Sequence, residues 1–184
     1  KGYRQRVGLA DAMVHNPRVL ILDEPTSGLD PNQVRDVRDL VKEIAGHTTV
    51  LFSTHTIPWV EQVCERVIVI HQGRLIQDGT LAEMRETVRP WARVEFHTRL
   101  PVEDVLQELG RTPGVIFAEN LTIGTETWLR FLTARERQRE VVGVVEAQLT
   151  ARGGGMERTE VRDAALEDLF TTLTRGGEQV EDRR

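Results

Sequence analysis

Two adjacent carboxylates are the residues of this chain whose types and spacing first suggest chemistry. Asp23 and Glu24 directly follow an apolar run, residues 19–22, that is bounded by Pro17 and Pro25. Such a short run predicts a strand buried on both faces of a parallel α/β sheet, with the carboxylates at its carboxyl end, where ligands bind in open sheets. Because neighbouring carboxylates repel, this placement is costly unless a cation, a water or a phosphate ligand uses them. A solvated acidic strand end is the alternative.

A histidine closes the next predicted strand. After a helix-like stretch, residues 33–44, a second apolar run over residues 49–54 ends in His55. The carboxyl ends of two consecutive parallel strands share one edge of the sheet, so we expect the carboxylates and His55 to come within reach of one ligand. A histidine that caps a helix or packs in the core is the alternative. Upstream, residues 1–6 lead into a predicted helix that stops before Asn16-Pro17.

Taken in order, these segments resemble the second half of the nucleotide-binding domain of ATP-binding cassette (ABC) proteins. The matching motifs are the signature tail (residues 2–6), the Walker B strand (19–23), the catalytic glutamate (Glu24), the D-loop (27–30), the switch histidine (His55), and the following helix and strand pair (57–66 and 67–79). The usual leucine, serine and first glycine of the signature are missing or replaced by Lys1. The resemblance covers about the first ninety residues, half of the chain.

The resemblance implies ATP hydrolysis, with ATP and Mg²⁺ as cofactors. Asp23 would hold Mg²⁺ through water, because Mg²⁺ keeps several waters and takes one or two carboxylates plus phosphate oxygens. Glu24 would orient and deprotonate the attacking water, and His55 would contact the γ-phosphate or that water.

The resemblance also implies nucleotide-binding residues at a dimer interface. Gly2, Tyr3 and Gln5 lie at a predicted helix start, which attracts anions, and this surface would close over the ATP bound to the opposite cassette of a homodimer. Ser27 and Asp30 would cross the same interface. Asp30 also fits a plain helix N-cap before a proline, and both roles can hold at once.

A phosphate-binding loop is the missing part of the pattern. No G-x-x-x-x-G-K-[ST] sequence occurs in the 184 residues, and the only lysines, Lys1 and Lys42, lie in other contexts. Such a loop cradles the phosphates of ATP. We therefore expect the chain to be the carboxyl-terminal portion of a longer subunit, and to bind ATP poorly or not at all by itself.

Composition restricts the partners. Residues 1–90 carry 11 Lys and Arg against 12 Asp and Glu, and residues 91–184 carry 13 against 17, so neither half offers a basic face and we expect no nucleic acid partner. Cys64 is the sole cysteine, which excludes an internal disulfide, fits a cytoplasmic setting and predicts a core residue. No apolar stretch approaches the ~20 residues that span a bilayer, so membrane association would come from a partner.

The second half shows no catalytic pattern. Its predicted elements follow the order β-α-β-β-α-β of a small ferredoxin-like sandwich, and a closing helix over residues 164–173 follows. That helix resembles the closing helix of bacterial exporter cassettes, including those named for gliding motility, multidrug and polysaccharide export. Everything after Arg175 is predicted to be disordered.

The sequence thus predicts an α/β fold with a small α+β ferredoxin-like domain over residues 91–175 and a disordered tail over residues 176–184. The resemblance implies that residues 1–88 are the carboxyl-terminal part of a P-loop NTPase (RecA-like) ABC cassette. The resemblance implies the ATPase subunit of an ABC exporter, on the inner face of the cell membrane and bound to a separate permease. The alternatives are a soluble ABC ATPase of translation or DNA repair, and a regulatory module that no longer hydrolyses ATP.

Overall fold

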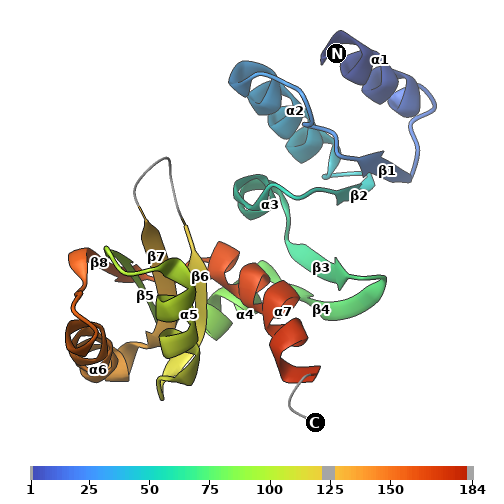
Figure 1. Cartoon of the computed structure of the whole chain (residues 1–184). Helices are drawn as coiled ribbons and strands as arrows, with labels where there is room; N and C mark the ends of the chain where they lie inside the picture. The colour runs from blue at the N-terminus through green and yellow to red at the C-terminus, as the bar shows by residue number, and fades with distance from the viewer. Residues whose placement is uncertain (1, 122–126, 182–184) are drawn as a thin grey trace. The chain divides into compact units, whose positions relative to one another are not determined.

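The computed structural model describes residues 2–121 and 127–181 and divides into two compact units, Lys1–Val67 and Ile68–Arg184 (Figure 1). The predicted change of domain at residues 88–91 lies inside the second unit and stays a prediction. The first unit contains α1 (Gly2–Met13), β1 (Val19–Asp23), α2 (Pro31–Ile44), β2 (Thr49–Ser53) and α3 (Ile57–Val63), and β3 (Arg66–His71) begins at its end.

The second unit continues with β4 (Arg74–Thr80), α4 (Leu81–Val88), β5 (Trp91–His97), α5 (Val102–Arg111), β6 (Val115–Asn120), β7 (Trp128–Ala134), η1 (Arg135–Arg137), α6 (Gln138–Ala151), β8 (Glu157–Asp163) and α7 (Leu166–Glu181). None of the helices within residues 2–121 and 127–181 is long and apolar enough to cross a membrane.

A parallel strand pair organises the first unit. β1 and β2 pair in register, with Asp23 opposite Ser53 at the carboxyl ends. α2 packs on them through Val37, Val41 and Ile44, which recur at helical spacing on one face. The other buried members of this core are Leu9, Leu20, Leu22 and Trp59. The sequence prediction of two consecutive parallel strands separated by a helix is confirmed.

The expectation that β1 is buried on both faces is wrong for the structure described. Along the strand, Leu20 and Leu22 are 3% and 9% exposed, whereas Val19 and Ile21 are 57% and 71% exposed. The reason is that α1 and α2 pack on one face of the strand pair, and the other helix of the first unit, α3, adds Trp59 to that same core. An apolar run predicts a buried strand, but it does not identify the elements that cover each face of that strand.

The second unit has the predicted ferredoxin-like topology. Its sheet has the order β6-β7-β5-β8, with β5 antiparallel to both β7 and β8 and β6 antiparallel to β7. One face carries the core: residues of β5 and β7 meet residues of α5 and α6. The buried members are Val94, Phe96, Val105, Leu109, Leu129, Phe131, Val141, Val145 and Leu149.

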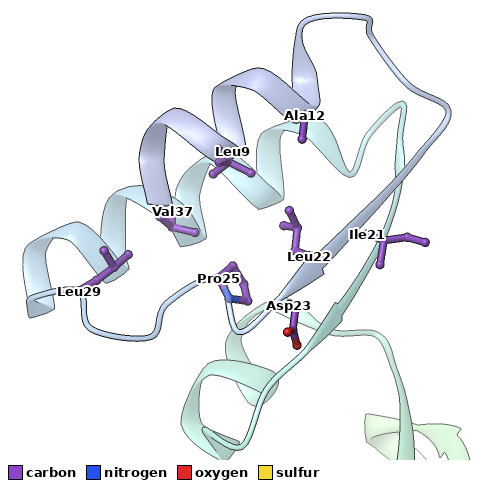
Figure 2. Close-up of a pocket in the computed structure, with 9 residues that line it drawn as sticks. Leu9, Ala12, Ile21, Leu22, Asp23, Pro25, Leu29 and Val37 are labelled. Carbon is purple, nitrogen blue, oxygen red and sulfur yellow. The ribbon is translucent and has the colours of Figure 1, made fainter. Parts of the chain in front are cut away.

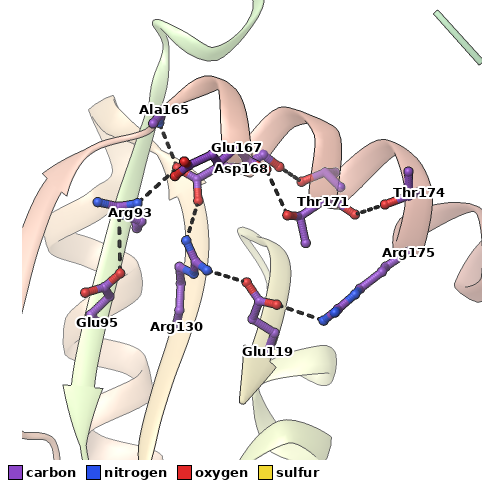
Figure 3. A network of polar contacts seen from close by, with 11 residues as sticks. Arg93, Glu95, Glu119, Arg130, Ala165, Glu167, Asp168, Thr171, Thr174 and Arg175 are labelled. Carbon is purple, nitrogen blue, oxygen red and sulfur yellow. Dashed lines mark hydrogen bonds and ion pairs between the residues drawn. The ribbon is translucent and has the colours of Figure 1, made fainter. Parts of the chain in front are cut away.

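Charged side chains occupy the opposite face of this sheet, because they alternate with the core residues along the strands. Asp168, from the first turn of α7, is 2% exposed, and its Oδ1 accepts a hydrogen bond from Arg130 Nη1 at 2.9 Å (Figure 3). Arg130 also pairs with Glu119 at 2.7 Å, and Arg93 Nη1 lies 3.7 Å from Asp168 Oδ2. Asp168 further accepts the backbone N–H of Ala165 at 2.7 Å. Asp168 therefore fixes both the start of α7 and its position on the sheet.

α3 ends at Val63, before its predicted end at Arg66, and two further helices differ from the sequence prediction. α4 was not predicted, although Thr80 and Glu83 form a capping box whose T-x-x-E spacing is visible in the sequence. α4 buries Leu81, Met84 and Val88 and packs against α7. The described part of α7 continues to Glu181, into the segment predicted to be a disordered tail; residues 182–184 lie outside the described residues.

We expect Asp168→Ala to lower the free energy of unfolding by about 3 kcal/mol, because it leaves the partly buried Arg130 with one carboxylate partner instead of two. The measurement is urea unfolding followed by circular dichroism. Glu167→Ala, one residue away on the exposed side of α7, is the matched control and should change stability by less than about 0.5 kcal/mol. Equal stability of the two variants would contradict the role given to Asp168.

Cys64 is half-buried just after α3, and burial raises the pKa of its thiol to about 11. Because the thiolate is the reactive form, we expect alkylation by iodoacetamide at pH 8 to be about a hundredfold slower in the folded protein than in urea, since a rise of the pKa from 9.0 to about 11 lowers the thiolate fraction by that factor. The raised pKa favours the protonated folded state, so this contribution to stability is complete below pH 9 and is lost as the pH rises towards 11. Mass spectrometry of alkylated protein gives the rates, and equal rates would refute the shift.

Candidate functional site

The candidate site lies where β1 and β2 end together. Parallel pairing sets Asp23 opposite Ser53, and the backbone continues this pairing one residue further, since Glu24 N–H donates to the Ser53 carbonyl at 3.1 Å. The chain therefore leaves β1 at a fixed point. The carboxylates of β1 and the residues that follow β2 are brought together by backbone hydrogen bonds before any side chain takes part.

Glu24 and His55 are in direct contact. Nδ1 of His55 lies 2.7 Å from Oε1 of Glu24. The side chain of His55 is 81% exposed and that of Glu24 34%, so the pair sits at the surface with one partner open to solvent. Thr54 Oγ1 accepts the backbone N–H of Thr56 at 3.1 Å, which shapes the turn that carries His55. A carboxylate and an imidazole in contact can hold and orient a proton or a water molecule.

The backbone of Glu24 is in the left-handed region, with φ of 43°. A residue with a Cβ pays about 1–2 kcal/mol for this conformation, which persists only where the surrounding structure determines it. Here the N–H of Glu24 is held by Ser53, and the Glu24 carbonyl accepts the N–H of Ser27 at 3.0 Å to close a turn with Pro25 at its second position. One of the four non-glycine residues with positive φ among those described is thus the candidate catalytic residue; the others are Asn16, Gln72 and Arg158.

The side chain of Ser53, rather than its backbone, holds Asp23. The Ser53 hydroxyl donates to Asp23 Oδ1 and also lies 3.3 Å from the Glu24 backbone nitrogen, whose N–H it accepts. The sequence analysis did not single out Ser53. Its signal was available in the predicted strand pairing, since the last residue of the second strand falls opposite the carboxylate that ends the first.

A cavity of about 250 Å³ lies beside Asp23 (Figure 2). Figure 2 shows Leu22 pointing toward α1 and α2, while Asp23 points to the other side of β1. Apart from Asp23, the side chains that line the cavity are apolar: Leu9, Ala12, Ile21, Leu22, Pro25, Leu29 and Val37. An apolar lining provides no hydrogen-bond donors or positive charges for a polyphosphate. The polar groups that could act on a substrate therefore lie at the ends of β1 and β2.

The remaining predicted site residues are spread over the turn and α1. Ser27 is exposed in the turn, and Gly28 has φ of 73°, which suits glycine. Asp30 caps α2, because its Oδ1 accepts the N–H groups of Asn32 and Gln33, both at 3.0 Å. The expected N-cap role of Asp30 is therefore present.

Three predicted nucleotide-binding residues lie at the start of α1. The side chain of Tyr3 is 81% exposed. Gly2 and Gln5 belong to the same helix, but the side-chain surroundings of these two positions lie outside what the structure describes. The structure therefore brings Asp23, Glu24 and His55 together at the strand ends and leaves the three α1 residues on a separate element.

Mg²⁺ would find a limited but suitable donor set here. Among the described residues, no group of three or more His, Cys, Asp or Glu side chains could hold a metal ion. Mg²⁺ that is held by one or two carboxylates and completed by water and phosphate oxygens does not need such a group. Asp23 fits this requirement, because a carboxylate that accepts the Ser53 hydroxyl keeps further acceptor capacity.

Comparison with known proteins identifies homologues of this chain at partial coverage. A model described as "AAA domain, putative AbiEii toxin, Type IV TA system" matches residues 4–57, which include Asp23, Glu24 and His55. The uncharacterized ABC transporter ATP-binding protein YdbJ of Bacillus subtilis (strain 168) is 48% identical over 88 residues, which are 47% of this chain and 29% of YdbJ. This chain is homologous to ABC transporter ATP-binding proteins.

Two further relatives match different shares of this chain. The methionine import ATP-binding protein MetN of Haemophilus influenzae (strain 86-028NP) is 40% identical over 119 residues, covering 61% of this chain and 34% of MetN. The daunorubicin resistance ATP-binding protein DrrA3 of Streptomyces coeruleorubidus is 32% identical over 185 residues, covering 98% of this chain and 55% of DrrA3. The chain therefore spans between 29% and 55% of the length of these three relatives.

Proposed function

We propose that the chain forms part of the ATP-hydrolysing subunit of an ABC exporter. The observation that carries the proposal is the contact between Glu24 and His55 at the ends of adjacent parallel strands, in a chain homologous to ABC transporter ATP-binding proteins. A carboxylate beside a histidine at this edge suits the activation of a water molecule for attack on a phosphoanhydride.

The proposed roles follow from the positions of the side chains. Glu24 would take a proton from the attacking water, and His55, in contact with its carboxylate, would orient that water and respond to the γ-phosphate. Asp23 would hold Mg²⁺, which neutralises charge that develops on the phosphate oxygens. The open side of His55, 81% exposed, is where substrate would approach.

Nucleotide contacts from a second copy complete the proposal. Gly2, Tyr3 and Gln5 at the start of α1, together with Ser27 and Asp30, would contact the ATP held by the opposite cassette of a homodimer. The exposure of Tyr3 and Ser27 supports such a role. The further proposed partner is a separate integral-membrane permease, which would place the subunit on the inner face of the cell membrane; the ABC transporter names of the relatives support this.

Export is the proposed direction of transport. DrrA3, named for daunorubicin resistance, matches 98% of the chain and hence both compact units. The match to MetN, named for methionine import, covers 61% of the chain. A relative that matches nearly all of both units is the better guide to the whole chain.

We further propose that these residues work as the carboxyl-terminal part of a longer subunit. The relatives are longer than this chain, and no phosphate-loop sequence occurs in the 184 residues. We expect the full product of the gene to bind and hydrolyse ATP, and the 184 residues alone to do neither at the same ATP concentration. Turnover assays and equilibrium binding on both proteins test this, and equal ATP affinity of the two would contradict it.

In the full product, Glu24→Gln should lower the ATP turnover number about a hundredfold or more while ATP still binds, because the amide cannot accept the proton of the attacking water. Glu43→Gln, an exposed position on α2, is the matched control and should keep wild-type turnover. Steady-state kinetics and equilibrium binding give the two quantities. Retained turnover in Glu24→Gln would remove Glu24 from the role of base.

A further inference from the structure

Ser53 contacts both candidate carboxylate residues, Asp23 and Glu24. It is the last residue of β2 and lies opposite Asp23 in the parallel register. Its carbonyl accepts the Glu24 N–H at 3.1 Å, a contact that any residue at this position could provide. Its hydroxyl makes two further contacts, which depend on the side chain.

The two contacts of the hydroxyl are compatible with each other. A serine hydroxyl has one proton to donate and two lone pairs that accept. The proton goes to Asp23 Oδ1, and a lone pair accepts the backbone N–H of Glu24 at 3.3 Å. One side chain therefore fixes the direction of the Asp23 carboxylate and also holds the backbone at Glu24.

The second contact matters because the backbone at Glu24 is strained. With φ of 43°, Glu24 holds a conformation that a glutamate adopts only where its neighbours determine it. That conformation carries the Glu24 carboxylate to His55 at 2.7 Å. A hydrogen bond to the Glu24 N–H therefore acts on the same geometry that joins the candidate base to the candidate switch histidine.

We propose that Ser53 is a positioning residue for the hydrolytic site, and that its hydroxyl holds Asp23 and Glu24 in their relative places. This inference rests on the proposed function. Ser53 touches neither nucleotide nor water in this proposal; it acts through the two carboxylates. Its loss should lower the turnover number and the apparent affinity for Mg²⁺ at Asp23, and leave the Michaelis constant for ATP nearly unchanged.

Threonine and valine at this position give a sharp comparison. Both side chains are β-branched, have nearly the same shape and suit a strand, and only threonine carries a hydroxyl. In the full product we expect Ser53→Thr to stay within about threefold of the wild-type turnover number. We expect Ser53→Val to fall about 10-fold to 100-fold, the range that small misplacement of catalytic groups costs, and to need a higher Mg²⁺ concentration for half-maximal rate.

Thr49→Val is the matched control, since it removes a hydroxyl from an exposed residue at the other end of β2 and should leave turnover and Mg²⁺ dependence unchanged. Equal losses in Ser53→Thr and Ser53→Val would mean that shape rather than the hydroxyl matters, and would overturn the proposal. Wild-type kinetics in Ser53→Val would also overturn it.

A second readout separates this inference from the proposed function. Crystal structures of the two Ser53 variants should show the Glu24–His55 contact and the positive φ of Glu24 kept with threonine and lost with valine. If the full product does not hydrolyse ATP, or if Glu24→Gln leaves turnover intact, the proposed function fails, and these structures alone decide what Ser53 does. Unchanged Glu24 geometry in Ser53→Val would refute the positioning role in either case.

Discussion

The parallel pairing of β1 with β2 is the constraint on which the candidate site depends. The register Asp23 to Ser53 and the additional bond from the Glu24 N–H fix where each strand ends. A slip of one residue would turn every side chain of the strand to the other face. It would separate Glu24 from His55, and Asp23 from the Ser53 hydroxyl. The geometry of the candidate site is thus a consequence of backbone hydrogen bonding, which sets the position of each side chain.

The same region combines local backbone strain with the candidate site. The left-handed backbone at Glu24 costs free energy and gains nothing for the core, whose apolar members Leu20 and Leu22 precede it in the strand. Its effect is to carry the carboxylate to His55. Asp30 differs from Glu24, because it stabilises the fold. Its carboxylate caps α2 while it remains exposed at the end of the turn.

The sequence predicted what depends on near neighbours. The apolar runs at residues 19–22 and 49–54 predicted β1 and β2, the Asp-Pro start predicted α2, and the alternation of elements predicted the ferredoxin-like order. It did not predict the exposed face of β1, because an apolar run does not identify the elements that pack against the strand. It missed the contacts of Ser53 with Asp23 and Glu24, because these depend on a register between strands thirty residues apart. It missed α4, although the Thr80 capping box was visible.

Asp168 extends this argument to the second unit. Asp168 is an acidic residue in the first turn of an amphipathic helix. A carboxylate at such a position usually lies at the surface, in contact with water, and interacts favourably with the positive end of the helix dipole. The structure buries it against Arg130 and Arg93, on the face of the sheet opposite the apolar core. A buried charge is tolerated only with partners, and these come from β5 and β7, far away in the sequence. The charge therefore restricts how α7 can dock: an apolar face alone would allow the helix to slide along the sheet, whereas one buried carboxylate between two arginines specifies a single position.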